Sequence, residues 1–142
     1  MTQETIYDPI RKMHVAATPE EKVRQRMLHH MLQMGFPAAL IAVEKNLADI
    51  IPLSSKKPPS RRIDIVCFSK KDHSPLLMIE CKAKKITRQA LLQVMGYNRL
   101  VQAPFIGLCS QDHLMIACWD HQTSQYAFSD HLQSYEKLLN AH

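Results

Sequence analysis

The chain has 142 residues and a net charge of +5, and 46% of its residues are hydrophobic. This length suits one domain with a single core, and the hydrophobic content excludes a wholly disordered chain. No apolar run approaches the roughly 20 residues of a membrane span, and the N-terminus lacks the pattern of a secretory signal, so we expect a cytoplasmic protein.

The positive charge is concentrated in the middle of the chain. From Lys56 to Arg99, eleven basic residues stand against three acidic ones, which gives this segment a charge of +8 and leaves −3 for the rest. A basic zone of this kind suits a polyanion such as DNA, and a solvated basic surface is the alternative.

Two further features of the composition exclude classes of protein. The chain has three glycines, and none belongs to the glycine-rich loop of nucleotide-driven motors, so no ATPase motor is encoded here. The four cysteines lie within apolar runs and lack the spacing of metal ligands, which predicts buried free thiols.

The first predicted elements are an arm and a helix. Residues 1–17 lack periodicity, and we expect an extended arm with a turn at Asp8-Pro9, followed by a single domain over residues 18–142. The run Thr18-Pro19-Glu20-Glu21 combines a cap, a first-turn proline and first-turn acids, so it predicts a helix that reaches about Met34.

The order of the later elements predicts an α/β fold, a mixed central β-sheet flanked by helices on both faces. The start of the first strand has a helical turn as its alternative. Because a helix connects strands 75–82 and 105–109, these two strands should be parallel. The predicted elements are a strand at 39–44, a connector at 46–59 with a basic tip at 56–60, hairpin strands at 61–68 and 75–82, a helix at 87–101, strands at 105–109, 114–119 and 126–128, and a last helix at 131–140.

The helix at 87–101 has two expected faces. Gln93 and Tyr97 lie one turn apart, so they should project together from one side. The residues predicted to face the sheet are Leu91, Leu92, Met95 and Leu100.

Charged residues interrupt the two hairpin strands, where a strand would normally avoid them. The first strand carries Asp64, and the second carries Glu80 and Lys82. Side chains alternate along a strand, so Glu80 and Lys82 share one face, and Asp64 shares its face with Val66 rather than with Ile63, Ile65 and Cys67. If the strands pair as a hairpin, Asp64 and Glu80 meet at one end of the sheet.

Two neighbouring carboxylates indicate a cation site. They repel each other unless a cation lies between them, and their hard oxygens suit Mg²⁺. A metal ion there could polarise a phosphoryl oxygen and activate a water, while Lys82 orients that water or stabilises developing charge. This is the chemistry of a metal-dependent phosphodiesterase, and a surface salt-bridge cluster is the alternative.

This interpretation carries a stability prediction. If repulsion between Asp64 and Glu80 is relieved only by a metal ion, removing either charge should relieve it too. We therefore expect Asp64→Asn to melt no lower than the unchanged protein in the absence of metal, whereas a clear loss would indicate a structural salt bridge.

Asp64 followed by Glu80-Cys81-Lys82 resembles the PD-(D/E)xK nuclease signature, with Ile63 where that signature often has proline. Over residues 18 to 128 the chain is similar to the small domain at the N-terminus of type I restriction enzyme R subunits. The matching segments are 18–25, 41–44, 62–66, 77–83, and Gln93 with Tyr97. The family often has an Asn-Gly turn where this chain has Ser110-Gln111-Asp112.

The resemblance implies a restriction-endonuclease-like fold and a DNA endonuclease that depends on Mg²⁺ or Mn²⁺. Asp64 and Glu80 would be metal ligands together with the carbonyl of Cys81, and Lys82 would assist the attacking water. In related nucleases a glutamate of the first helix approaches the site; Glu21 fits this best, and the neighbouring glutamate at position 20 is the alternate.

The resemblance also implies residues that act around the metal. Gln93 and Tyr97 correspond to a family Gln-x-x-x-Tyr motif that orients the site or the DNA backbone. Glu44 is a further candidate, with a structural role as its alternative. The basic residues expected to contact DNA are Arg62, Lys84, Lys85 and Arg88.

The expected partners are DNA and a helicase or other subunit supplied by another chain, since full restriction subunits carry a helicase motor. Two alternatives to an active nuclease remain. One is a non-catalytic nucleic-acid-binding module with the same fold, and the other is an assembly subunit whose basic zone binds an acidic partner.

Overall fold

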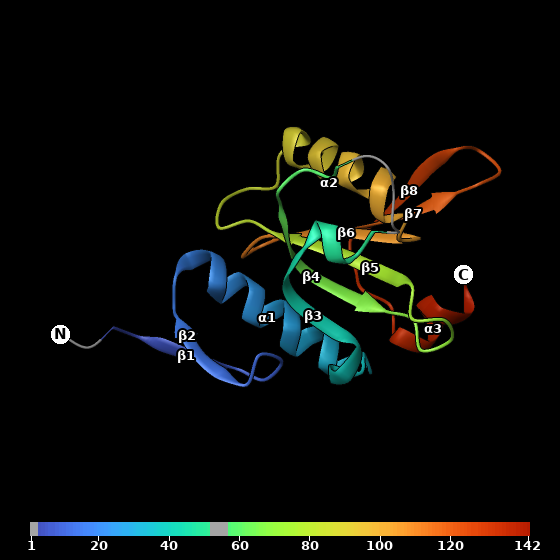
Figure 1. Cartoon of the computed structure of the whole chain (residues 1–142). Coiled ribbons are helices and arrows are strands. Elements are labelled where there is room, and N and C mark those ends of the chain that lie inside the picture. Colours follow the sequence, from blue (N-terminus) through green and yellow to red (C-terminus); the bar gives the residue numbers. More distant parts are fainter. Residues whose placement is uncertain (1–2, 52–56) are drawn as a thin grey trace.

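The computed structural model describes residues 3–51 and 57–142, and its central element is a six-stranded mixed sheet (Figure 1). Neighbours pair antiparallel except β5 and β6, which are parallel and joined through α2 as predicted. In order across the sheet, the strands are β3 (Ile41–Asn46), β4 (Arg62–Phe68), β5 (Pro75–Cys81), β6 (Phe105–Cys109), β7 (Leu114–Asp120) and β8 (Gln125–Ser129).

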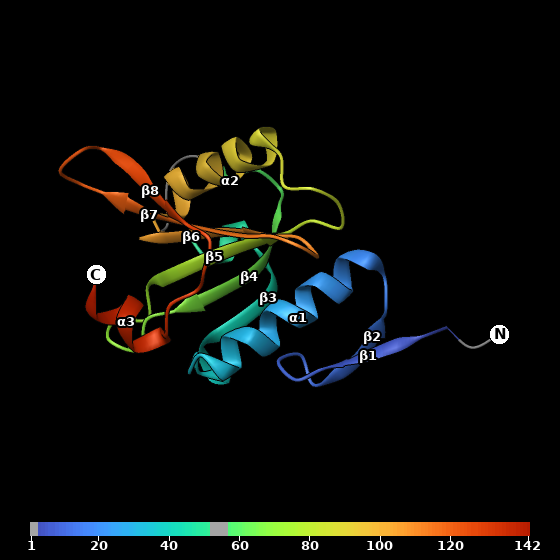
Figure 2. The same ribbon diagram turned by 180° about the vertical axis from the view of Figure 1, so that it is seen from behind.

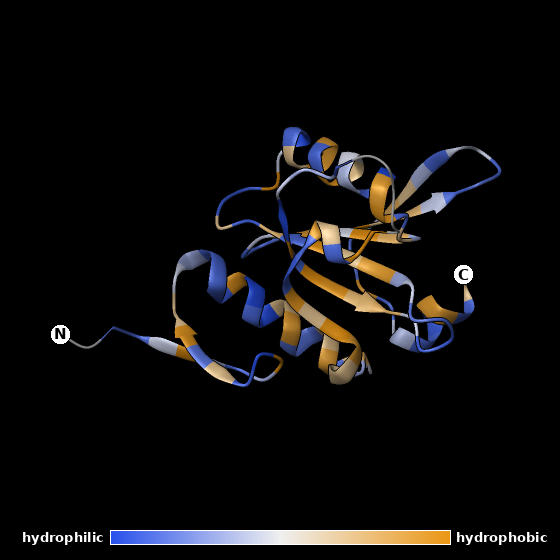
Figure 3. Cartoon of the chain, in the orientation of Figure 1, coloured by the Kyte–Doolittle hydropathy of each residue, from blue (hydrophilic) through white to orange (hydrophobic). Residues whose placement is uncertain are grey.

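Helices cover both faces of this sheet, which confirms the predicted α/β architecture (Figures 1 and 2). One face packs against α1 (Pro19–Gln33) and α3 (Tyr135–Asn140), and the other against α2 (Arg88–Val101). The colouring of Figure 3 shows the hydrophobic residues gathered on the central strands between these helices. The strands at the centre are therefore buried on both faces, as strands between two helical layers must be.

The two long helices begin where local capping chemistry predicts. The Thr18 hydroxyl accepts a hydrogen bond from the Glu21 amide at 3.1 Å, and the Thr87 hydroxyl accepts one from the Ala90 amide at 3.1 Å. Each bond satisfies an amide that has no partner within the helix. After α1 the chain turns at Gly35, whose φ of 85° is a conformation that favours glycine.

The N-terminal arm is extended and turns at Asp8-Pro9 as predicted, but its pairing into a hairpin was not predicted. It is a β-hairpin of β1 (Thr5–Asp8) and β2 (Met13–Ala16), which pair antiparallel as a separate two-stranded sheet. The expected turn at Asp8-Pro9 is present and connects these two strands. Strands this short escape a search for periodicity.

The face of α2 was also predicted incorrectly in part. Leu92 is 55% exposed, while Leu91, Met95 and Leu100 only border the core. The buried face is instead formed by Ala90, Val94, Asn98 and Val101. The polar Asn98 lies on this face because its side chain bonds both the carbonyl and the amide of Ala103.

The remaining elements differ at their boundaries. The expected first strand starts with a 3₁₀ turn, Ala38–Leu40, and a second such turn, Leu47–Asp49, opens the connector. The basic tip expected at 56–60 lies partly outside the described residues, and the last helix is shorter than predicted. All four cysteines are free thiols as predicted; three are buried and Cys118 is half-buried.

Within the described ranges, 3–51 and 57–142, no helix has the length and apolar composition that crossing a membrane requires.

Candidate functional site

Asp64 and Glu80 meet where the pairing of β4 with β5 ends. The last paired residues are Ile65 and Ile79, and one position further on the two carboxylates bond to the backbone of the opposite strand. The Asp64 amide donates to Glu80 Oε1 at 3.3 Å, and the Cys81 amide donates to Asp64 Oδ2 at 2.8 Å. Both acids are buried, at 8% and 2% exposure. The geometry thus brings together the two residues that the sequence singled out.

The strand backbone is irregular at this point. Ile65 and Cys67 lie in the core against α1, as the alternation predicts, but Ile63 lies in the core against α2. The predicted facing of Ile63 is therefore wrong. Opposite Asp64, Glu44 of β3 has a φ of 52°, a left-handed conformation that interrupts the regular alternation.

Burial and the neighbouring Asp64 carboxylate raise the pKa of Glu80 from 4.5 to about 7. Arg61 acts in the opposite direction, because its Nη2 lies 3.1 Å from Glu80 Oε2. The raised pKa means that a negative charge on Glu80 is incompletely compensated by the protein. An additional cation would compensate it.

Asp64 is held by Arg24 of α1, a residue to which the sequence analysis gave no role. Arg24 Nη2 lies 2.7 Å from Asp64 Oδ1, and Nη1 lies 2.6 Å from Glu21 Oε1. Burial alone would lower the pKa of Arg24, but the bond and charge of Asp64, helped by Glu21, raise it above its ordinary value. The guanidinium is therefore always charged. It is a cation that already neutralises part of the acidic cluster.

Glu80 is held by Arg61, which links it to the Gln93 and Tyr97 pair of α2. The Arg61 guanidinium lies over the Tyr97 ring, 5.4 Å from its centroid, a cation–π geometry. Gln93 Nε2 donates to Tyr97 Oη at 3.1 Å, so the two side chains project together as predicted. Their connection to the acidic pair is indirect, because Arg61 contacts both the Tyr97 ring and Glu80.

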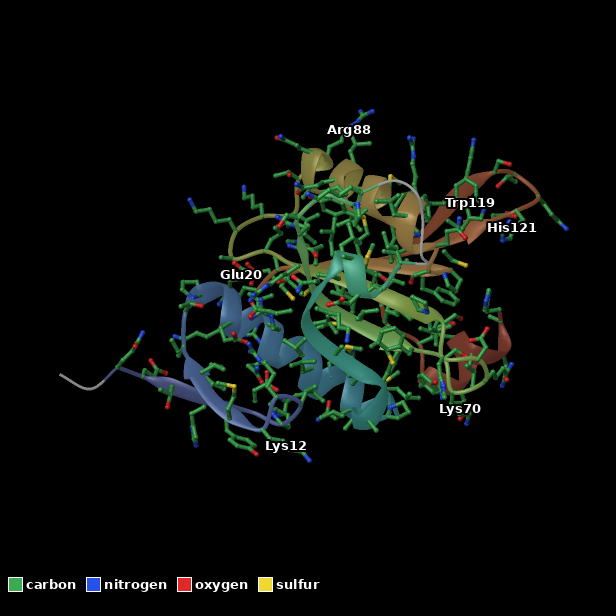
Figure 4. The ribbon with its side chains drawn as sticks, in the orientation of Figure 1. Lys12, Glu20, Lys70, Arg88, Trp119 and His121 are labelled. Atoms are coloured by element: carbon green, nitrogen blue, oxygen red, sulfur yellow. The ribbon has the colours of Figure 1, made fainter. Side chains whose placement is uncertain are left out.

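The structure distinguishes the two glutamates at the start of α1. Glu21 is 6% exposed, and Arg24 and Arg11 bind its two oxygens, so its position is inside an ion-pair network. The side chain of Glu20 is 52% exposed, and burial together with the Asp64 carboxylate raises its pKa. Arg24 Nη2 lies 3.7 Å from Glu20 Oε1 and 2.7 Å from Asp64 Oδ1, so Glu20 and Asp64 approach the same guanidinium nitrogen; Figure 4 labels Glu20 at the start of α1. The family resemblance favours Glu21 for this position, with Glu20 as the alternate.

Lys82 follows directly after β5 and is half-buried. Its amide donates to the Cys109 carbonyl at 2.8 Å, and its ammonium is near enough to Glu20 to oppose the rise in that pKa. Lys82, Lys85 and Gln93 line an open hollow of about 580 Å³ on the surface. The third predicted member of the site thus borders solvent, two residues after Glu80 along the chain.

The predicted DNA-contacting residues are all exposed but differ in position. Lys84 and Lys85 line an open hollow of about 1460 Å³ between the loop after β5, the β6–β7 turn and the end of β8. Arg62 begins β4, and Arg88 begins α2. Figure 4 shows Arg88 at the outer surface of α2, pointing away from the sheet.

The donor set suits a hard divalent ion that retains several waters. Two carboxylates lie next to each other at a buried strand end, and one has a raised pKa. Among the described residues, no group of three or more His, Cys, Asp or Glu side chains is arranged to hold a metal. Mg²⁺ is commonly bound by only one or two carboxylates plus waters, so it fits this pair. Each carboxylate oxygen has further lone pairs besides those that the protein donors use.

Three arginines that contact the acids had no assigned role in the sequence analysis: Arg11, Arg24 and Arg61. For Arg24 a local signal exists, because Glu20 and Glu21 lie four and three residues before it on one helix. No comparable signal marks Arg11 or its contact with Glu44, which lies 33 residues away.

Comparison with known proteins adds a family and a fold. A family model described as the type I restriction enzyme R protein N terminus matches residues 19–132. Among solved structures, a fragment described as an HsdR subunit of a type I restriction enzyme from Vibrio vulnificus YJ016 is similar with a TM-score of 0.58. It is 14% identical, and the match covers 87% of this chain and 24% of that chain. The likeness confirms the expected fold, and this chain spans about a quarter of the length of that solved fragment. A search of curated proteins found no match.

Proposed function

We propose that this chain, which belongs to the family of type I restriction enzyme R protein N termini, is a metal-dependent endonuclease domain that hydrolyses phosphodiester bonds in DNA. The observation that carries the proposal is the reciprocal bonding of Asp64 and Glu80 across the end of the β4–β5 pair; Lys82 follows directly after β5. The raised pKa of Glu80 supports a cation at this position.

In this proposal Asp64 and Glu80 hold Mg²⁺ or Mn²⁺ with the Cys81 carbonyl. When bound, the ion would polarise a phosphate oxygen and lower the pKa of a nearby water. Lys82 would orient the attacking water from the surface hollow and stabilise charge that develops on the phosphate. Glu20, next to Asp64 and open to solvent, would replace Glu21 as the helix glutamate that approaches the site.

The other residues act by holding these groups in place. Arg24 fixes the Asp64 carboxylate, and Arg61 connects Glu80 to Tyr97, with Gln93 behind it. An arginine fork is suited to this because its donors have a rigid planar geometry. DNA would approach over the exposed lysines of the loop after β5, and the chain would work in the cytoplasm, where its DNA substrate is.

The test is cleavage of supercoiled plasmid with Mg²⁺ or Mn²⁺. We expect Asp64→Ala to lose at least 100-fold in rate, as removal of a metal ligand should. Asp72→Ala is the matched control, because Asp72 is exposed in the turn at the other end of the same hairpin and should cut normally. Wild-type protein that cuts no plasmid with either ion, or Asp64→Ala that cuts like wild type, contradicts the proposal.

One observation favours a non-catalytic DNA-binding module. Arg24 and Arg61 already contact Asp64 and Glu80, so the cluster is partly neutralised without a metal ion. DNA binding that survives Lys82→Ala in a protein without cleavage activity would support this second function. Absence of DNA binding at about 50 mM salt, where phosphate contacts are strongest, would instead favour an assembly subunit. A helicase supplied by another chain stays our proposed partner.

A further inference from the structure

The β1–β2 hairpin is the part of the fold that the proposed chemistry does not explain. It pairs with no strand of the central sheet, and both Figure 1 and Figure 2 show it against α1, outside that sheet. Its turn nevertheless supplies an arginine to the acidic cluster. The contacts run without a gap from this turn to Asp64.

Asp8 anchors the turn. It is fully buried, and its Oδ1 accepts bonds from the amides of Ile10 at 2.7 Å and Arg11 at 2.9 Å. Its Oδ2 accepts bonds from Arg11 Nε at 2.6 Å and Gln25 Nε2 at 2.9 Å. Burial alone would raise the pKa of Asp8, but these bonds lower it below its ordinary value. Asp8 thereby fixes both the backbone of the turn and the direction of the Arg11 side chain.

Arg11 and Arg24 share two carboxylates. Arg11 Nη2 lies 2.9 Å from Glu21 Oε2, and Arg24 Nη1 lies 2.6 Å from Glu21 Oε1. Arg11 Nη1 lies 3.4 Å from Glu44 Oε2, and Arg24 Nη2 lies 3.3 Å from Glu44 Oε1. The four side chains form a closed ring of alternating charge, and Arg24 extends from it to Asp64.

Several carboxylates lie within reach of the Arg24 guanidinium, and the ring helps to keep Arg24 on Asp64. Glu21, Glu44 and Asp64 all lie within 3.3 Å of its guanidinium nitrogens, and Glu20 lies at 3.7 Å. Arg11 neutralises the free oxygens of Glu21 and Glu44, so these residues do not draw Arg24 away from Asp64. Glu44, which pairs with both arginines, has a left-handed backbone, a conformation that persists only where surrounding contacts hold it.

We propose that Arg11 is a positioning residue, which acts through Glu21, Glu44 and Arg24 to orient the Asp64 carboxylate for the metal ion. The inference rests on the proposed function, since it concerns the metal ligand of that site. It makes the N-terminal hairpin part of the catalytic apparatus rather than an appendage.

The test is the double variant Asp8→Asn with Arg11→Met, which removes the pair together and leaves the net charge unchanged. The matched control is Glu4→Gln with Lys22→Met, an exposed pair at the same hairpin–helix junction whose atoms lie 3.9 Å apart. Mn²⁺ binding is measured by calorimetry without DNA, and kcat and KM by plasmid cleavage. Circular dichroism and a thermal melt select conditions in which every variant is folded.

We expect the Asp8/Arg11 variant to bind Mn²⁺ at least tenfold more weakly and to lose a similar factor in kcat, with KM for DNA unchanged. The control should match wild type in all three quantities. Arg11→Lys, which keeps the charge but not the fork that holds two carboxylates, should fold and give an intermediate loss.

Three outcomes would overturn the inference. If the Asp8/Arg11 variant keeps the Mn²⁺ affinity and kcat of the wild-type protein, the inference is wrong and the proposed function is unaffected. A rise in KM alone would overturn the inference by showing that the hairpin contacts DNA. Wild-type protein that neither binds Mn²⁺ nor cleaves would defeat the proposed function and the inference with it, and is recognised without any variant.

Discussion

At the scale of single residues, the raised pKa of Glu80 makes the free energy of unfolding depend on pH. Burial and Asp64 raise its pKa from 4.5 to about 7, so between these values the folded protein keeps a proton that the unfolded chain has lost. The stability from this group is therefore complete below about pH 4.5 and is lost as the pH rises through 7. In metal-free protein, the free energy of unfolding measured with urea should therefore fall by up to about 1.4 kcal/mol per pH unit as Glu80 loses its proton.

Glu80→Gln should remove most of this pH dependence and raise the stability above pH 7. Saturating Mg²⁺ should likewise reduce the pH dependence of the unfolding free energy of the wild-type protein, because the ion stabilises the charged form of Glu80. A variant that retains the wild-type slope between pH 5 and 7 would show that another group titrates there.

Asp64 behaves differently from its neighbour, and its ion pair with Arg24 favours the salt-bridge alternative to the stability prediction made from the sequence. Its Oδ1 binds the buried Arg24 at 2.7 Å and its Oδ2 accepts the Cys81 amide, so the protein already compensates its charge. We now expect Asp64→Asn without metal to lose about 2 kcal/mol, typical for a charged hydrogen bond with the partner left buried. Thermal melts in EDTA beside Asp72→Asn measure this, and equal melting temperatures would contradict it.

At the scale of elements, α1 carries the side chains that connect the hairpin to the sheet. Its first turn holds Glu20 and Glu21, and the Thr18 cap fixes where that turn begins. Thr18→Ala should lower the stability by about 1 kcal/mol and also weaken cleavage, because fraying of the first turn displaces both glutamates.

The matched control for the α1 cap is Ser134→Ala, which removes the cap of α3. We expect a similar loss of stability from the same lost bond, but normal cleavage, since α3 supplies none of the site residues. Equal activity of the two variants at a temperature where both are folded would mean that the first turn of α1 does not contribute to the site.

At the scale of the whole molecule, the basic residues are the expected surface for DNA. Lys84 and Lys85 are exposed in the loop after β5 and line the open hollow of about 1460 Å³. Each phosphate contact contributes close to one unit to the slope of log affinity against log salt. Replacing both lysines by glutamine should therefore weaken DNA binding without metal and reduce that slope by about two units.

The control for this measurement replaces Lys70 and Lys71 by glutamine. These two adjacent lysines lie in the β4–β5 turn near α3, where Lys70 pairs with Glu136 at 2.6 Å (Figure 4). The control removes the same charge and should leave the salt slope unchanged. An equal loss in both variants would indicate attraction by net charge rather than by a defined surface.

Much of the fold could be predicted because its signals are local. The caps Thr18 and Thr87 bond to amides three residues away, and the apolar runs of β4 and β5 identify buried strands. The pairing of Asp64 with Glu80 follows from a hairpin between adjacent strands. The face of α2 could not be assigned reliably, since Leu92 and Val94 are both apolar and only the packed neighbours decide which is buried.

The arginines that contact the acids could not be identified from the sequence, because most of them lie far along the chain from the carboxylates they bind. Arg24 reaches Asp64 across 40 residues of sequence, Arg61 reaches Glu80 across 19, and Arg11 reaches Glu44 across 33. An ion pair forms wherever charges are brought within about 4 Å, and sequence spacing carries no record of that unless both residues share one helix or hairpin. The acids and the strands that carry them could therefore be identified from residue order. The contacts of Arg24 and Arg11, and the exposure of Glu20 in place of Glu21, arose from the packing of α1 and the β1–β2 hairpin against the sheet, whereas Arg61 lies beside β4 on the hairpin that also carries Glu80.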